Sequence, residues 1–312
     1  MRGRLSYGAK VTAQLVTRNF KIFLKDKMLV FMSLLAPLIV LLLYVLFLGD
    51  TQKESIISML PEGSIDIKAI NAFVNGWMIA GVMSVSCITV ALSSATIVVA
   101  DKEKGIINDY VASPVPKALI KTAYLISTFA ITTVICLIVE MIGLIYLAAT
   151  GWYLTVSDVF AVLGITVLSI LSASILMNLI LAPFKSTNAV GAFTGIISAA
   201  IGFFMGAYIP LPMLGKGVEY AACFIPGTYS AGVFRDLFMG GVLEYAGDYL
   251  PEAAVSELAG GYSVKVNCFG NAISAQTSAA ILAGITVAIL LVWLFAPMLI
   301  RVVKDKLKAK KQ

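Results

Sequence analysis

Residues 69–100 read AINAFVNGWMIAGVMSVSCITVALSSATIVVA and contain no Asp, Glu, Lys or Arg. A helix needs about 20 apolar residues to cross a hydrocarbon core about 30 Å thick, so this run is long enough to span a membrane. Of the 312 residues, 60% are apolar and 13% charged, whereas soluble domains have roughly 45–50% and about 25%. Because a water-compatible surface cannot cover so much apolar side chain, the sequence predicts a membrane protein.

Uncharged runs of this kind recur along the chain. They predict six transmembrane helices, at about 28–48, 73–100, 121–148, 158–182, 187–208 and 276–300. We therefore expect an all-α, polytopic membrane protein, in which a cytoplasmic segment, 1–27, precedes a single transmembrane domain, 28–312.

The basic residues indicate the orientation of these helices. Segments 1–27, 101–121 and 301–312, together with Lys185, contain 18 of the 23 Lys and Arg residues. Short cytoplasmic segments have an excess of positive charge, so both termini are expected in the cytoplasm. The net charge of +6 is then a topology signal, and we expect no nucleic-acid partner. The expected location is the cell (plasma) membrane, specifically a bacterial inner membrane.

Several kinds of chemistry are excluded by what the sequence lacks. There is no His and there are only four Cys, which removes His-based triads, His-ligated metals and a dense disulfide framework. No Gly-x-x-x-x-Gly-Lys-Ser/Thr occurs, so no phosphate-binding loop of that type is present. We expect that the chain is not an enzyme by itself and has no cofactor or metal site.

Residues 5–25 have the pattern of a basic amphipathic helix. The polar residues lie along one helical stripe: Lys10, Gln14, Arg18, Lys21 and Lys25. Such a helix lies in the inner membrane interface. Two interpretations stay open, namely an anchor that only fixes topology and a helix that also contacts a cytoplasmic partner.

The loop 101–116, DKEKGIINDYVASPVP, predicts a second, shorter amphipathic helix. Its apolar residues share one face: Ile106, Ile107, Tyr110 and Val111. Asn108 and Asp109 lie on the other face, and Pro114 ends the helix after about two turns. A helix this short is marginal in water, so we expect its apolar face to dock on the lipid surface or in a groove of a soluble partner.

The segment 209–275, on the exterior side, changes composition partway. Its first part is apolar but broken at Pro226, and a seventh crossing there would place the basic tail outside, so we expect a re-entrant hairpin in the outer leaflet. Residues 240–267 are acidic and Gly-rich and predict a solvated loop. Cys223 and Cys268, 45 residues apart, are either a disulfide or two thiols.

This layout resembles the permease subunits of ABC exporters of the second type. Residues Glu103, Lys104 and Gly105, followed by Ser113, Pro114 and Val115, resemble the Glu-(Lys/Arg)-Glu-x-Gly and Ser-Pro-(Val/Ile) pattern of that family. The segment FIPGTYSAGVFRDLF resembles the family's Pro…Arg segment, with Pro226 and Arg235 at the matching positions. The resemblance covers essentially the whole chain in layout and about 25 residues in motifs.

The resemblance implies a function and partners. The loop helix would be the coupling helix, which sits in a cleft of an ATP-binding subunit, and the matching residues are Glu103, Gly105, Ile107, Tyr110 and Pro114. Two ATP-binding cassette subunits, which hold ATP and Mg, and a second permease, identical or related, would complete the transporter within membrane lipid. The complete transporter would export an amphiphilic or hydrophobic substrate of the drug, peptide, lipid or glycan type, as in multidrug resistance.

Four residues are candidates for the transport pathway. Glu140 is the single Asp, Glu, Lys or Arg residue that interrupts an apolar segment, where a charge costs about 2.5–3.5 kcal/mol. Asn75, Phe203 and Phe204 lie near the outer ends of spans two and five. For each of the four, a role in helix packing is the alternative.

Two other classes of protein would share this topology. An ion-coupled secondary transporter would need ionisable residues in its spans, and Glu140 alone gives thin support. A membrane enzyme acting on lipid would need His or clustered acids there, and the spans have neither.

Overall fold

The computed structural model describes residues 2–59 and 65–309; Lys310 and Lys311 of the basic tail lie outside the described residues. The long helices are α1 (Arg2–Lys25), α2 (Lys27–Leu43), α4 (Ile67–Glu103), α6 (Lys117–Thr150), α7 (Val156–Ile180), α8 (Thr187–Phe204), α10 (Pro226–Gly247) and α12 (Ala275–Ala309). The shorter elements are the π-helical turn η1 (Tyr44–Leu48), α3 (Gly49–Met59), α5 (Ile106–Ala112), the 3-10 turn η2 (Leu211–Leu214), α9 (Lys216–Ala222), α11 (Glu252–Gly261) and the hairpin β1 (Val266–Cys268) and β2 (Asn271–Ile273).

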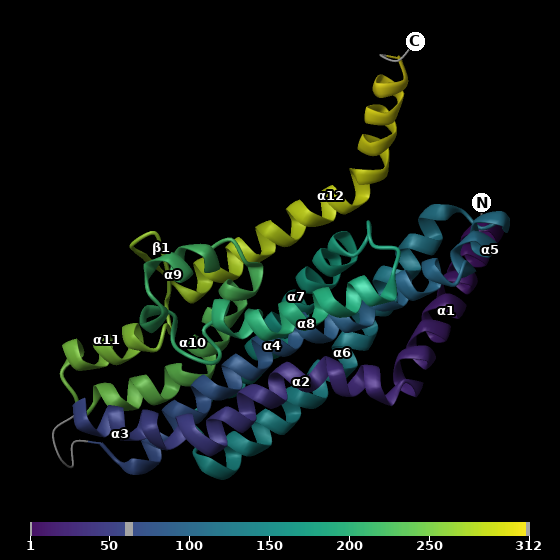
Figure 1. Cartoon of the computed structure of the whole chain (residues 1–312). Helices are drawn as coiled ribbons and strands as arrows, with labels where there is room; N and C mark the ends of the chain where they lie inside the picture. The colour runs from purple at the N-terminus through teal and green to yellow at the C-terminus, as the bar shows by residue number, and fades with distance from the viewer. Residues whose placement is uncertain (1, 60–64, 310–312) are drawn as a thin grey trace.

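The predicted fold class and the six spans are confirmed. Six helices of the described residues are long and apolar enough to cross a membrane: Lys27–Ser58, Ile67–Glu103, Lys117–Thr150, Val156–Ile180, Thr187–Phe204 and Ala275–Phe295. The first three start or end several residues beyond the predicted limits because the helical backbone continues past the apolar run. Figure 1 shows α5 and α1 at one end of the molecule, here named the α5 end, and α3 and α11 at the other, the α11 end.

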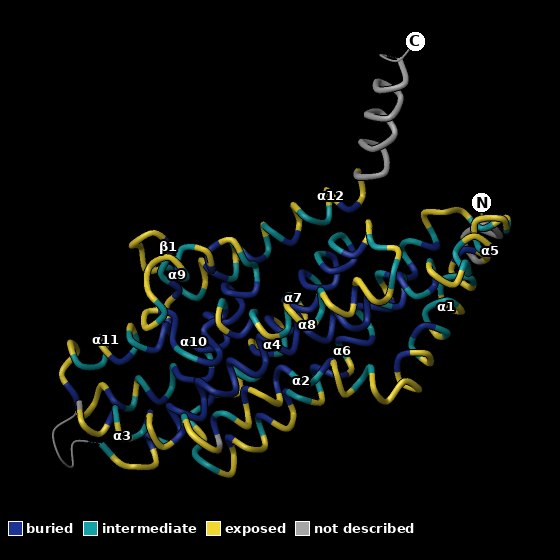
Figure 2. The backbone as a smooth tube through the Cα atoms, in the orientation of Figure 1, coloured by how far each residue is buried: buried dark blue, intermediate teal, exposed yellow. Residues whose placement is uncertain are grey.

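Helix α4 forms the centre of the bundle. It packs against α2, α6, α7, α8 and α10, and nearly every residue from Ala69 to Ala95 is buried. Figure 2 shows this as a continuous dark-blue tube between more exposed outer helices. Its hydroxyl groups bond to carbonyls one turn back, for example Ser86 to Val82 at 2.6 Å and Thr89 to Val85 at 3.1 Å. Polar side chains can therefore lie in an apolar interior without unsatisfied donors.

Glycines bring α4 close to the elements that follow α8. A Cβ atom at Gly76 would lie 2.8 Å from the carbonyl oxygen of Phe238 in α10. A Cβ at Gly81 would lie 3.1 Å from the Cβ of Ala207. Small residues permit such close backbone approach between membrane helices, which adds van der Waals contact.

The segment after α8 is more ordered than the sequence predicts. The solvated loop expected at 240–267 is wrong: α10 continues to Gly247, α11 follows, and Val242, Ala246 and Leu258 are buried. Although this segment is acidic and Gly-rich, it also has apolar residues at helical spacing, Val242, Ala246 and Leu250. These side chains belong to the buried core that includes α4. The re-entrant position of α9 and α10 in the outer leaflet stays a prediction.

Helix α1 has one face on protein and one face exposed. Phe23 is fully buried, and the Asn19 amide donates to Ser127 Oγ of α6 at 3.1 Å. Lys10, Lys21 and Lys25 of the predicted polar stripe are exposed. The amphipathic helix is confirmed, but part of its circumference packs on α6.

We predict that Gly241→Ala destabilises the protein. A Cβ there would overlap the carbonyl oxygen of Tyr153, where α10 crosses the connection between α6 and α7. Because the Tyr153 backbone can move aside only at a cost in free energy, the free energy of unfolding should fall by about 1–3 kcal/mol. Thermal unfolding of the detergent-solubilised protein measures this.

The neighbouring Gly240 is a matched control because a Cβ at this position meets no atom within 4 Å. Gly240→Ala should leave stability unchanged or raise it by about 0.5–1 kcal/mol, since Ala favours a helix interior. Equal effects of the two substitutions would contradict the close approach at Tyr153.

Candidate functional site

Four elements meet at a charged junction at the α5 end. Arg18 of α1 donates to Asp101 of α4 with Nη1–Oδ2 at 2.5 Å and Nη2–Oδ1 at 2.9 Å. The Tyr124 hydroxyl of α6 donates to the same carboxylate at 2.5 Å, and the Arg18 guanidinium lies 5.9 Å from the ring centroid of Tyr110 in α5. The hydrogen bond and charge of Asp101 raise the pKa of Arg18. A buried carboxylate bonded at both oxygens therefore links the N-terminal helix to the loop helix.

The loop helix α5 is held against its own chain. Gly105, with φ of +77°, turns the chain between α4 and α5 in a conformation that favours glycine. Ile107 and Tyr110 are half-buried and pack on the cluster that contains Phe23 of α1. Part of the predicted apolar face therefore packs within the chain, and its contact with lipid or a soluble partner stays a prediction. The α5 residues turned outward are Asn108, Asp109, Val111 and Ala112.

The end of α4 also holds the connection between α7 and α8. Glu103 accepts from the Thr187 backbone N–H at 3.0 Å and from the Thr187 hydroxyl, at the start of α8. Lys102 Nζ donates to the Ala182 carbonyl at 2.7 Å. A carboxylate at a helix N-terminus is favourable because it faces the positive end of the helix dipole. Glu103 thus binds within its own chain, while Pro114 is exposed.

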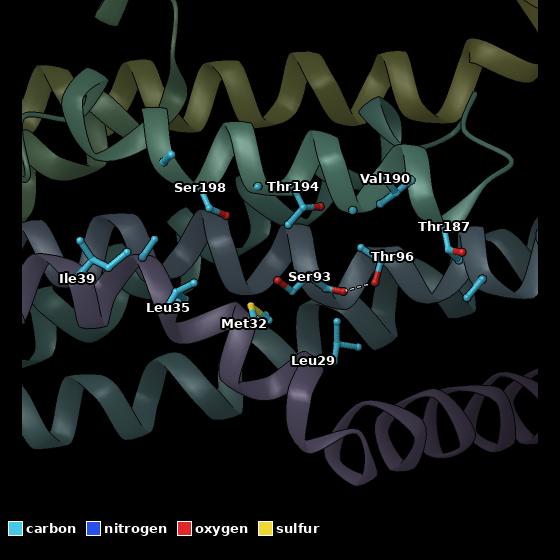
Figure 3. Close-up of a pocket in the computed structure, with 15 residues that line it drawn as sticks. Leu29, Met32, Leu35, Ile39, Ser93, Thr96, Thr187, Val190, Thr194 and Ser198 are labelled. Atoms are coloured by element: carbon cyan, nitrogen blue, oxygen red, sulfur yellow. Dashed lines mark hydrogen bonds between the residues drawn. The ribbon is translucent and has the colours of Figure 1, made fainter.

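A groove of about 490 Å³ lies between α2, α4 and α8. Figure 3 shows Thr194 and Ser198 of α8 facing Leu35, Met32 and Ser93 across it. The lining residues are apolar or hydroxyl-bearing, without a charged group: Leu29, Met32, Leu35, Ala36, Ile39, Ser93, Thr96, Ala100, Thr187, Val190, Gly191, Thr194, Gly195, Ser198 and Ala199. The Thr194 hydroxyl is buried and has no hydrogen-bond partner among the described residues.

The four predicted pathway residues lie outside this groove. Asn75 accepts from the Tyr146 hydroxyl at 3.4 Å, which joins α4 to α6. Glu140 is 1% exposed and lies near Thr166 of α7, but its carboxylate oxygens make no hydrogen bond to a described residue. Phe203 packs edge-on against Tyr208 with ring centroids 4.9 Å apart, and Phe204 is half-buried.

Sequence reasoning missed the groove residues, although a signal was present. In α8, Thr187, Gly191, Thr194, Gly195 and Ser198 recur at three- and four-residue spacing, which places small and hydroxyl side chains on one helical face. The predicted pathway residues were charged, amide or aromatic, and none of these small and hydroxyl residues was among them.

Pro226 and Arg235 lie near the other end of α8 and have structural roles there. Pro226 is the first residue of α10, where its missing N–H costs nothing. Arg235 is fully buried and donates to the carbonyls of Met205, of Gly206 at 2.9 Å and of Ser263 at 3.3 Å. Burial lowers the pKa of Arg235 to about 10, so it stays cationic at neutral pH beside the carbonyl end of α8.

Cys223 and Cys268 are joined in the structure. Cys223, which ends α9, and Cys268, which ends β1, form a disulfide with Cα atoms 5.8 Å apart. This spacing is usual for a disulfide. The bond connects the segment before α10 to the hairpin before α12, whereas Cys87 and Cys136 are buried thiols.

Comparison with protein families decides the assignment. Residues 11–239 match the family described as ABC-2 type transporter, which covers most of the chain. The chain belongs to the ABC-2 type transporter family. It is therefore a multi-pass membrane protein and a permease component of an ABC transporter, and the predicted membership of this family is confirmed. Comparisons with curated proteins and with solved structures give no match.

We predict that Arg18 and Asp101 of the permease are energetically coupled. Arg18→Ala and Asp101→Ala should each lower the free energy of unfolding, because each single change leaves one charge unpaired. The loss in the double variant should be smaller than the sum of the two single losses by about 1–3 kcal/mol. Chemical denaturation in detergent measures the cycle.

Lys21, exposed one turn along α1, supplies the control. Lys21→Ala combined with Asp101→Ala should be additive within about 0.5 kcal/mol. Additivity of the Arg18 pair would contradict a stabilising junction.

Proposed function

We propose that this permease is the transmembrane subunit of an ATP-driven exporter that moves an amphiphilic or hydrophobic substrate out of the cell. The observation that carries the proposal is the α2–α4–α8 groove, because its walls combine apolar side chains with isolated hydroxyls and contain no charged group. Its volume of about 490 Å³ falls in the range of about 300–1,000 Å³ usual for small-molecule sites. An ion-coupled carrier would need charged ligands here, which disfavours that alternative.

A second permease is proposed to pack against α8. Gly191, Gly195 and Ala199 recur every four residues on its exposed face, and a Cβ at either glycine meets no atom within 4 Å. Small residues at this spacing permit close helix approach in a membrane. A second copy or a related chain in this position would close the open side of the groove.

ATP would be hydrolysed on two separate ATP-binding subunits, which would also bind Mg. We expect one of these subunits to contact the permease at its α5 end, on the cytoplasmic side. The exposed residues of α5 are Asn108, Asp109, Val111 and Ala112. Helix α4 joins α5 to the groove, since Ser93, Thr96 and Ala100 line the groove and Glu103 ends the helix. A displacement of α5 would therefore move one groove wall.

The first experiment tests the outward face of α5. Asp109→Arg should reduce the amount of ATP-binding subunit that co-purifies with the permease by about tenfold or more, because a charge is reversed inside the contact. Asp248→Arg is the control, since Asp248 is also exposed but lies between α10 and α11, and Figure 1 shows α11 at the opposite end of the molecule from α5. Equal loss in both variants, or in neither, would contradict the assigned face.

The second experiment tests the groove. Gly195→Leu should remove most ATP-dependent transport of a fluorescent amphiphile in inverted membrane vesicles, because the new side chain fills the groove. Gly164→Leu in α7 is the control, since Gly164 is exposed and equally open but lines no part of the groove. Transport that persists in Gly195→Leu, or that needs an ion gradient and no ATP, would contradict the proposal.

A further inference from the structure

A second cavity, of about 270 Å³, lies at the α5 end between α4, α5, α6, α7 and α12. Three lysines line it: Lys102, Lys117 and Lys121. Its apolar wall includes Val98, Ile107, Val111 and Ile120, and Trp293 of α12 closes one side. We name this cavity the lysine pocket. It is separate from the α2–α4–α8 groove because no residue lines both.

The positive charge of the lysine pocket is not neutralised by the described carboxylates. The ion pairs among the described residues join Arg18 to Asp101 and Lys53 to Asp50, and neither includes a pocket lysine. Asp101 and Glu103 flank Lys102 in the sequence. Both oxygens of Asp101 are bonded to Arg18, with a further bond from Tyr124, and Glu103 accepts from Thr187. Asp101 therefore does not offset the three ammonium groups.

The position of two of the lysines adds to this imbalance. Lys117 is the first residue of α6 and Lys121 lies one turn later, so both are at the positive end of the α6 dipole. A cation is unfavourable there unless an anion is close. Lys121 is held in place by Trp293, with Nζ 4.0 Å from the ring centroid and a hydrogen bond to the Trp293 carbonyl.

We propose that the lysine pocket binds the phosphate headgroup of an anionic phospholipid from the membrane leaflet at the α5 end. Basic pockets between transmembrane helices bind anionic headgroups, and Trp is enriched at the level where headgroups lie. The apolar wall of Val98 and Ile120 suits the first part of the acyl chains. A volume of about 270 Å³ is below the range of about 300–1,000 Å³ for whole small-molecule ligands, which fits a headgroup better than an export substrate.

The bound lipid would contact helices that do not line the α2–α4–α8 groove. Ile107 and Val111 belong to α5 and Trp293 to α12, so the headgroup would join the proposed coupling helix to the last span. The proposal needs only that the protein lies in a membrane, and it stands or falls independently of the transport proposal.

The test uses the full-length permease in a neutral detergent, titrated with phosphatidylglycerol and, separately, with phosphatidylcholine of the same acyl chains. Native mass spectrometry counts the bound lipids. We expect saturable binding of phosphatidylglycerol. The affinity should fall about fivefold in Lys117→Gln and about 25-fold in Lys117→Gln with Lys121→Gln, because each lysine near an anionic headgroup contributes a similar amount to the binding free energy. The control removes the same charge from two exposed lysines outside the pocket, Lys104→Gln with Lys185→Gln.

A thermal-shift measurement keeps the test valid if the double variant folds poorly. At one lipid concentration, phosphatidylglycerol should raise the unfolding temperature of the wild type and of the control, and should raise that of the single variant Lys117→Gln by less, because the affinity of this variant is about fivefold lower. The Lys117 side chain is exposed, so its replacement should leave the fold intact. Equal effects of pocket and control variants, or equal binding of the two lipids, would overturn the proposal. Inorganic phosphate that binds as tightly as the lipid would instead identify a free-anion site. Unchanged lipid binding with loss of the ATP-binding subunit would assign the lysines to that partner.

Discussion

Inside a bilayer every backbone and hydroxyl donor must find a partner within the protein, and the 37-residue helix α4 supplies carbonyl acceptors to its own hydroxyls at Ser84, Ser86, Thr89 and Ser94. At 1.5 Å per residue it is about 55 Å long, well beyond the hydrocarbon core of about 30 Å. One continuous helix therefore contributes a wall of the groove and also reaches the charged junction at the α5 end. The rest of the fold depends on it: α2, α6, α7, α8 and α10 all pack on its surface.

The two ends of the bundle are fixed by different interactions. At the α5 end, Asp101 joins α1, α4 and α6 through charge-assisted hydrogen bonds, and Glu103 holds the start of α8. Toward the α11 end, Arg235 binds carbonyls at the end of α8 and beyond α11. Helix α8 is thus held at both termini, while its middle is exposed and lined by small residues. This arrangement leaves the middle of α8 as the wall most open to a second permease.

Much of the fold could be predicted from the sequence, because lipid imposes length and polarity rules that single segments obey alone. The six spans, the amphipathic α1 and the short α5 follow from apolar runs, charge stripes and prolines. The partners of these elements could not be predicted. Arg18 and Asp101 are 83 residues apart, and nothing in either segment indicates that they meet. For the same reason the sequence did not indicate that Ile107 and Tyr110 of α5 would pack on the cluster around Phe23 of α1, while Val111 of the same apolar face stays exposed.

The central claim is that α4 transmits a displacement of α5 to the groove. It is tested most directly by the distance between spin labels at Thr96→Cys in α4 and Thr194→Cys in α8, on opposite walls of the groove. Double electron–electron resonance would be recorded on the permease bound to its ATP-binding subunits, first without nucleotide and then with ATP trapped by vanadate. The account predicts a resolved shift of the distance distribution between the two conditions. An unchanged distribution, while the ATP-binding subunits close, would contradict it.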